Sequence, residues 1–181
     1  FEREYYSPGG GFFLWKGQSE ADRGKPLYSY HSMTQFKVIA KENKKSLHEI
    51  ILENEKAIMK IGDREINAHL DMVIKIMLDG VRQGLQEEGL LPAPFVFHRK
   101  AKRIYERSRK AKGGDGFMGR LSSYALAVSE GNAAGRLAVT APTLGSAGTM
   151  PAIVSVMKEM KLSRDAMRKG LMAAGLVGYL C

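Results

Sequence analysis

Hydrophobic residues recur at every third or fourth position along most of the chain, which is the period of an amphipathic α-helix. The longest such run begins at Asp63 and ends near Gly89. Its apolar positions are Ile66, Leu70, Val73, Ile74, Met77, Leu78, Val81 and Leu85. The same period predicts shorter helices that begin at Met33 and at Leu47, and others over residues 98–110, 117–130, 149–160 and 163–181.

Several helix ends are marked by residues with special backbone behaviour. Ser46 and Glu49 have the spacing of a capping box, in which each side chain can accept a hydrogen bond from the backbone N–H of the other residue. Pro92 and Pro94 lack the N–H that a helix needs, so residues 91–94 separate two helices. The glycines of residues 113–116 predict a second break between helices.

The first thirty residues lack the helical period. Aromatic residues flank the run from Pro8 to Gly11, which predicts two short strands joined by a turn. Residues 16–30 are polar with scattered glycine and proline, as in a linker. We therefore expect a mainly α fold, with a short β-type segment and linker over residues 1–30 and a helical region over residues 31–181.

Composition narrows the class of protein. A chain of 181 residues with 44% hydrophobic and 26% charged residues suits one soluble globular domain with a tail. No apolar run approaches the roughly 20 residues of a membrane span, so we expect no membrane association. The one cysteine, Cys181, excludes an internal disulfide and favours a reducing compartment, the cytoplasm. The helical period continues to the last residue, which is typical of a segment of a longer protein.

The formal net charge of +9 is concentrated in one segment. Residues 99–112 contain eight basic residues and one acidic residue, Glu106. Such a run suggests a module that binds nucleic acid or an acidic partner. A dense basic run is more often a solvated helix face, and Tyr105 is the one aromatic residue within it. Nucleic acid is therefore not the partner that we expect.

The segment from Thr140 to Pro151 is the strongest candidate for chemistry. Gly145, Ser146, Ala147 and Gly148 have small side chains or none, and Pro151 fits the first turn of the helix that follows. Backbone N–H groups at a helix N-terminus can bind a carboxylate or a phosphate. The alternative is that the small residues only allow close packing or form an N-cap, and the sequence leaves both interpretations open.

A second polar segment ends the preceding helix. Glu130 and Asn132 could face the same cavity as the hydroxyl of Thr143, or Asn132 could lie in the turn that caps the helix. No two of the four histidines have the i, i+4 spacing of metal ligands on a helix. We therefore assign no histidine and no metal ligand in this chain.

Taken together, these segments resemble the bacterial iron–sulfur L-serine dehydratases, also called L-serine ammonia-lyases. The resemblance covers most of the chain in the right order. It rests on Tyr5–Phe12, Glu53–Ala57, Gly84-Leu85, Gly89–Pro92, Ala125–Arg136 and Val139–Ala152. It implies that residues 1–30 end a small β domain and that residues 31–181 begin the α-helical catalytic domain.

The resemblance also implies a reaction. Members of the family convert L-serine to pyruvate and ammonia with a [4Fe–4S] cluster and without pyridoxal phosphate. The cluster ligands are expected outside this chain, which alone should be inactive, and we do not assign Cys181 as a ligand. The substrate-binding residues implied for this chain are Thr143, Gly145, Ser146, Ala147, Gly148 and Asn132. The catalytic base is not identified.

Two further questions stay open in the sequence. A related lyase that acts on another amino acid, such as L-cysteine, fits the same residues. The spacing of Gly170, Ala174 and Gly178 would allow close helix packing within one chain or between two, and so is compatible with a homodimer.

Overall fold

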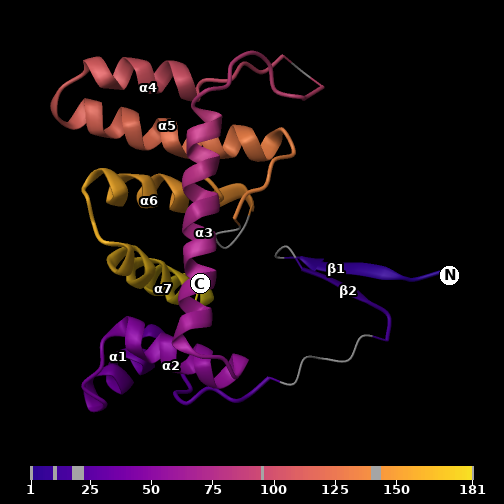
Figure 1. Cartoon of the computed structure of the whole chain (residues 1–181), viewed down its shortest axis with the longest axis vertical. Coiled ribbons are helices and arrows are strands. Elements are labelled where there is room, and N and C mark those ends of the chain that lie inside the picture. The colour runs from indigo at the N-terminus through magenta and orange to yellow at the C-terminus, as the bar shows by residue number, and fades with distance from the viewer. Residues whose placement is uncertain (1, 10–11, 18–22, 95, 140–143, 181) are drawn as a thin grey trace. The chain divides into compact units, whose positions relative to one another are not determined.

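The computed structural model describes residues 2–9, 12–17, 23–94, 96–139 and 144–180. These residues form the mainly helical fold that the sequence predicted (Figure 1). Contacts divide the chain into two compact units, a first unit of residues 1–69 and 169–181 and a second unit of residues 70–168. The elements are β1 (Tyr5–Gly9), β2 (Phe12–Trp15), α1 (Met33–Glu42), α2 (Leu47–Met59), α3 (Asp63–Gly84), α4 (Ala101–Lys110), α5 (Gly113–Ala133), the short 3₁₀-helix η1 (Leu144–Ser146), α6 (Thr149–Glu159) and α7 (Arg164–Leu180).

The first unit holds the β-hairpin and a small helical core. Strands β1 and β2 pair antiparallel, with Tyr5 opposite Trp15, which confirms the two predicted strands; the residues between them, 10 and 11, lie outside the described residues. The core of the helical part is formed by Phe36 of α1, Ile50 of α2 and Leu176 of α7, all of them buried. The capping box at the start of α2 is also confirmed.

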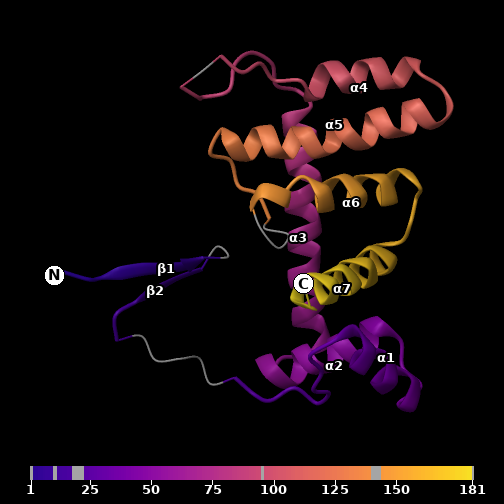
Figure 2. The same ribbon diagram turned by 180° about the vertical axis from the view of Figure 1, so that it is seen from behind.

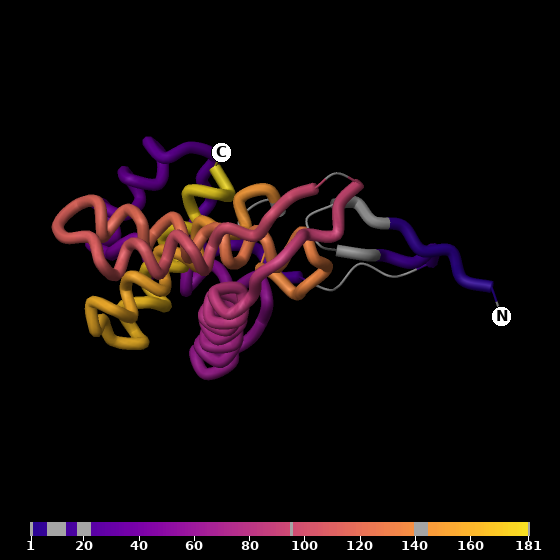
Figure 3. Tube along the Cα trace, turned by 90° about the horizontal axis from the view of Figure 1, so that it is seen from above, coloured from indigo at the N-terminus to yellow at the C-terminus, as the bar shows by residue number. Residues whose placement is uncertain are grey.

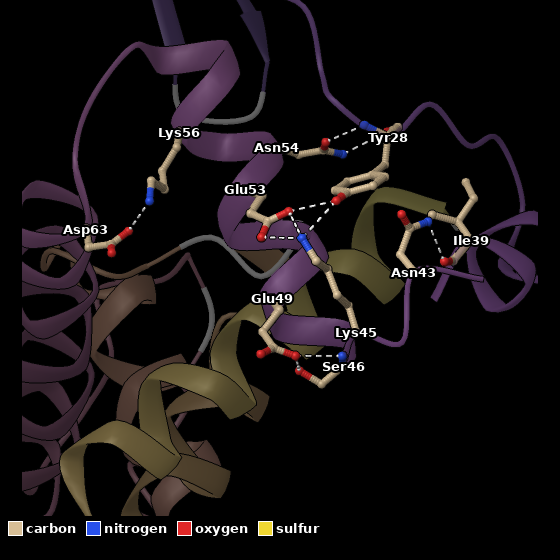
Figure 4. Close-up of polar contacts among 10 residues, drawn as sticks. All are labelled: Tyr28, Ile39, Asn43, Lys45, Ser46, Glu49, Glu53, Asn54, Lys56 and Asp63. Atoms are coloured by element: carbon tan, nitrogen blue, oxygen red, sulfur yellow. Dashed lines mark hydrogen bonds and ion pairs between the residues drawn. The ribbon is translucent and has the colours of Figure 1, made fainter. Parts of the chain in front are cut away.

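The segment before α1 is fixed to α2 rather than being only a linker. The backbone N–H of Tyr28 donates to Asn54 Oδ1 and Asn54 Nδ2 donates to the carbonyl of Tyr28, both at 2.8 Å (Figure 4). Gly24 N–H donates to the carbonyl of Ile58 at 2.8 Å. A Cβ on Gly24 would lie 2.0 Å from the carbonyl oxygen of Ala57, so only glycine allows this close approach.

An ionic cluster joins the same segment to α2. Lys45 Nζ lies 2.6 Å from both carboxylate oxygens of Glu53 and 2.9 Å from Tyr28 Oη (Figure 4). Tyr28 Oη in turn donates to Glu53 Oε2 at 2.8 Å. The hydrogen bonds with Glu53, and then with Tyr28, raise the pKa of Lys45 to about 12. The same contacts with Lys45 and Tyr28 lower the pKa of Glu53.

In the second unit, helices α4, α5 and α6 lie in successive layers and α3 crosses them (Figures 1 and 2). The core between these helices contains Val81 of α3, Tyr124 and Val128 of α5, and Ala152 and Val156 of α6. Among the described residues, no helix combines the length and apolarity that a membrane span requires.

The break predicted over residues 113–116 is wrong, because α5 begins at Gly113. Two of its early glycines lie against α4 instead of ending a helix. A Cβ on Gly116 would be 2.6 Å from the carbonyl oxygen of Ala111, and one on Gly119 would be 2.7 Å from Ser108 Cβ. Helix α3 also ends at Gly84, a few residues before the predicted end near Gly89, because the N–H groups of Gln86 and Glu87 donate to carbonyls three residues earlier, those of Gln83 and Gly84, instead of four.

The Asn54→Ala variant should lower the free energy of unfolding by about 1–3 kcal/mol, because the N–H and the carbonyl of Tyr28 both lose their partner. Chemical denaturation followed by circular dichroism measures this change. The control is Asn43→Ala, which removes an exposed amide that donates to the carbonyl of Ile39; this carbonyl still accepts from the Asn43 N–H, so stability should change by less than about 0.5 kcal/mol. Equal effects of the two variants would contradict a role for the Asn54 pair.

Stability should depend on pH through Glu53. Its pKa is lowered in the folded state, so its contribution is present above the unfolded pKa of about 4.3 and is lost as the pH falls through the folded value. Glu53→Gln should therefore be less stable than the wild type at pH 7, and the difference should shrink below about pH 4. Urea denaturation across this pH range checks the prediction, and a pH-independent difference would contradict it.

Candidate functional site

A cavity of about 330 Å³ opens in the second unit between α3 and the end of α5. Five of its lining residues carry polar or charged side chains, and the others are apolar residues or glycines. The lining residues are Lys75, Ile76, Asp79, Gly80, Gln83, Val128, Gly131, Asn132, Arg136 and Leu137. Its volume is at the lower end of the range for small-molecule sites.

Close packing of α3 on α5 forms the inner wall of this cavity. A Cβ on Gly84 would lie 2.3 Å from the carbonyl oxygen of Ala127, so the two helix backbones touch at this point. One turn earlier, a Cβ on Gly80 would make ordinary contact with Val128 at 3.5 Å. Glycines at 80 and 131 leave the space that larger side chains would fill.

Charges of both signs line the cavity. Asp79 of α3 lies 2.6 Å from Lys75 Nζ and 3.0 Å from Arg82 Nη2. The hydrogen bond from Lys75 is the main cause of the lowered pKa of Asp79, so this carboxylate is ionised at neutral pH. On the other side, Arg136 donates to Gln83 Oε1 at 3.1 Å and forms an ion pair with Glu87.

Asn132 is the sequence-predicted residue that the structure places in the cavity wall. It lies in the last turn of α5 and is half-buried. Within the described residues its side-chain amide makes no hydrogen bond. A half-buried amide carries two donors and an acceptor, so it can bind a polar ligand without first breaking an internal hydrogen bond.

The predicted turn lies beside the same helix. A Cβ on Gly148 would be 2.3 Å from the carbonyl oxygen of Ala125 and 2.6 Å from Ser129 Oγ. Residues 125, 129 and 132 are spaced by four and three positions, so Asn132 shares the face of α5 that contacts Gly148. The cavity wall and the turn are therefore neighbours along one helix face.

The predicted residues of the turn differ in their exposure to solvent. Ala147 and Gly148 are buried, Ser146 is half-buried and Gly145 is exposed. The contact of Gly148 with α5 supports the packing interpretation that the sequence left open. Gly145 and Ser146 remain on the accessible side, at the N-terminal end of α6. Thr143 lies outside the described residues.

Glu130, which the sequence placed with Asn132, lies elsewhere. Its Oε1 accepts hydrogen bonds from the backbone N–H groups of Lys100 at 2.6 Å and Ala101 at 3.3 Å. Its carboxylate is buried and caps the N-terminus of α4, where a negative charge is favourable. Two positions along a helix separate side chains by about 200°, so Glu130 and Asn132 point to different neighbours.

Sequence reasoning missed Lys75, Asp79, Gln83 and Arg136. The first three are spaced by four residues, so they form a polar stripe on one side of α3, and this spacing is visible in the sequence. Arg136 carries no such signal, because its contacts with Gln83 and Glu87 depend on the turn that follows α5.

The described residues contain no group of three or more His, Cys, Asp or Glu side chains that could hold a metal ion. The single cysteine of the sequence, Cys181, lies outside the described residues. An iron–sulfur cluster is usually held by several thiolates. The donor set of this chain therefore does not fit a [4Fe–4S] cluster.

Comparison with known proteins assigns the chain to a family. Residues 42–181 match the serine dehydratase alpha chain family. The chain belongs to this family. The match includes the whole second unit, and so both the cavity and the turn.

Comparison with individual proteins also finds L-serine dehydratases. The chain is 31% identical over 189 residues to the L-serine dehydratase of Haemophilus influenzae and 32% identical over 189 residues to L-serine dehydratase 1 of Escherichia coli. It is 32% identical over 186 residues to the L-serine dehydratase of Streptomyces coelicolor. These matches cover 98–99% of the chain but only 40–41% of each relative. The chain thus spans about two-fifths of the length of these relatives.

Gly148→Val should destabilise the chain, because the added atoms meet the backbone of α5. We expect a loss of at least about 1–3 kcal/mol, seen as a fall of several degrees in Tm. The control is Gly114→Ala near the start of α5, where an added Cβ meets nothing within 4 Å. A thermal melt of Gly148→Val that matches the wild type would contradict the packing role of this glycine.

Proposed function

We propose that this chain is the substrate-positioning part of an L-serine ammonia-lyase, which converts L-serine to pyruvate and ammonia. The observation that carries the proposal is the cavity beside Asn132, in a member of the serine dehydratase family whose named relatives are L-serine dehydratases. In this reaction serine loses its α-proton and its hydroxyl as water. The aminoacrylate that remains rearranges to an imine, which water hydrolyses to pyruvate and ammonia.

The charges of the cavity suit a small zwitterion. L-serine carries a carboxylate and an ammonium group, and the cavity presents both cations and an anion, Arg136, Lys75 and Asp79, together with the amides of Gln83 and Asn132. Holding the substrate by its charged groups fixes the orientation of the bond that breaks, and orientation alone can supply a large part of a rate enhancement. In this proposal Asn132 contacts the substrate directly.

The turn before α6 supplies the second part of the proposed site. The backbone N–H groups of Ser146, Ala147 and Gly148 and the hydroxyl of Thr143 would hold the serine carboxylate, and Gly145, which has no side chain, would leave room for it. Support comes from the position of the turn at the N-terminus of α6, where the helix dipole favours a negative group. Its contact with the Asn132 face of α5 adds to this support.

Dependence on a [4Fe–4S] cluster, without pyridoxal phosphate, belongs to the proposal through the family resemblance. Because the donor set of this chain does not fit a cluster, we assign no residue of this chain to it. Its ligands would lie in the part of the catalytic domain that this chain does not span, and the 181-residue chain alone would be inactive. The assay below also tests whether the substrate is L-cysteine instead of L-serine.

Asn132→Ala in the complete protein, purified without oxygen, should lower kcat/KM for L-serine by about 10- to 100-fold, because a hydrogen bond to a charged group is lost. Pyruvate release from L-serine, with L-cysteine assayed in parallel, measures the effect. Thr143→Val tests the turn in the same assay.

The matched control is Asn43→Ala, an asparagine of the first unit that the proposal does not use. It should leave kcat/KM unchanged. Unchanged kinetics in both Asn132→Ala and Thr143→Val would overturn the proposed site. Turnover of L-cysteine and not of L-serine would keep the site but change the substrate.

A further inference from the structure

Helix α4 is held against α5 by one face only. Ala101 and Ser108 are buried on this face, and the ring of Tyr105 packs against that of Tyr124, with centroids 5.8 Å apart. Gly116 and Gly119 of α5 allow the two helices to approach at backbone distance. Figure 3 shows the two helices side by side from above. The opposite face of α4 is therefore exposed, while the helix itself is held in place by its packing on α5.

That opposite face carries a group of exposed cations, which we call the α4 basic face. Its members lie on α4 or just after it, and none forms an ion pair with an acidic side chain of the described residues. The members opposite the buried residues are Arg103, Arg107 and Lys110, and the exposed Arg109 and Lys112 flank them at the C-terminal end of α4. Arg103, Arg107 and Lys110 are spaced by four and three residues, so they form a straight row about 10 Å long.

The neighbouring cations behave differently. Arg99 is nearly buried and lies 2.8 Å from Glu87 Oε2, while Lys102 Nζ lies 2.9 Å from Glu88 Oε1. Arg99 and Lys102 thus differ from the α4 basic face, because each has an acidic partner within the chain. Arg103 and Arg107 are like charges at i, i+4, an arrangement that destabilises a helix slightly, and neither has an acidic partner within ion-pair distance among the described residues.

We propose that the α4 basic face binds an acidic segment of a partner protein. Arginine pairs with carboxylates through two parallel hydrogen bonds, and an acidic helix or extended segment can place carboxylates opposite Arg103 and Arg107. This interaction is independent of serine turnover, because the α4 basic face shares no residue with the cavity or the turn.

Two features favour a protein segment over nucleic acid. Glu106 lies within the row, between Arg103 and Lys110. A uniform polyphosphate would be repelled there, whereas a peptide can place a neutral or basic residue opposite it. In addition, the one aromatic residue of α4, Tyr105, is half-buried and its ring packs against Tyr124 on the opposite side of the helix from the basic row, so it is not placed for a base to stack beside these cations.

The test uses the 181-residue chain and a short fluorescein-labelled peptide of Glu-Glu-Ala-Ala repeats. Fluorescence anisotropy should detect binding that weakens as the salt concentration rises from about 50 to 200 mM. The double variant Arg103→Gln/Arg107→Gln should weaken the affinity about tenfold or more. The matched control, Lys37→Gln/Lys41→Gln, removes two exposed cations at the same i, i+4 spacing on α1 and should change affinity little. Circular dichroism confirms that each variant is folded.

Four outcomes would overturn the proposal. The first is that the peptide does not bind the folded chain at low salt, and the second is that it binds the α4 variant as tightly as the wild type. The third is that the two double variants lose the same affinity, which would mean that only total charge matters. The fourth is that poly(U) RNA binds more tightly than the peptide and depends on the same arginines, which would make the α4 basic face a nucleic-acid site.

Discussion

Backbone-to-backbone contact between α5 and its neighbours is the constraint on which the second unit depends. Gly84 brings α3 against the carbonyl of Ala127, and Gly148 brings the start of α6 against the carbonyl of Ala125. On the α4 side, Gly116 and Gly119 of α5 itself provide the close approach. A side chain at these positions would push the helices apart and open the core around Tyr124 and Val128. The cavity, the turn and the α4 basic face are thus all positioned by one helix.

This arrangement explains why some elements could be predicted from the sequence. The capping box at Ser46, the long amphipathic helix from Asp63 and the strand pair around Pro8 are encoded by residues close together in the chain, and local rules describe them. The glycines at 113–116 follow the same local rules toward a helix break, yet α5 begins there. The interruption falls instead at residues 111–112, and the tight packing of Gly116 against the carbonyl of Ala111 lets α5 start beside the end of α4.

The residues of the candidate site also fall into those that the sequence could indicate and those that it could not. Asn132 and the turn at 145–148 could be found because small and polar residues interrupt an apolar pattern, and because the motifs resemble a known family. The role of Glu130 could not be found, since it depends on the backbone of Lys100, thirty residues earlier in the chain. Likewise Arg136 reaches the cavity through Gln83, more than fifty residues away. Burial and hydrogen bonds between residues far apart in the sequence determine where Glu130 and Arg136 lie.

The pair between Asn54 and Tyr28 has a consequence for how the chain moves. The segment before α1 has no regular secondary structure, and the amide hydrogens of such segments usually exchange with solvent faster than those of helices. The amide of Tyr28, however, is bound to a buried side chain of α2. It should therefore exchange as slowly as the amides of α2, so that an irregular segment opens together with the helix against which it lies.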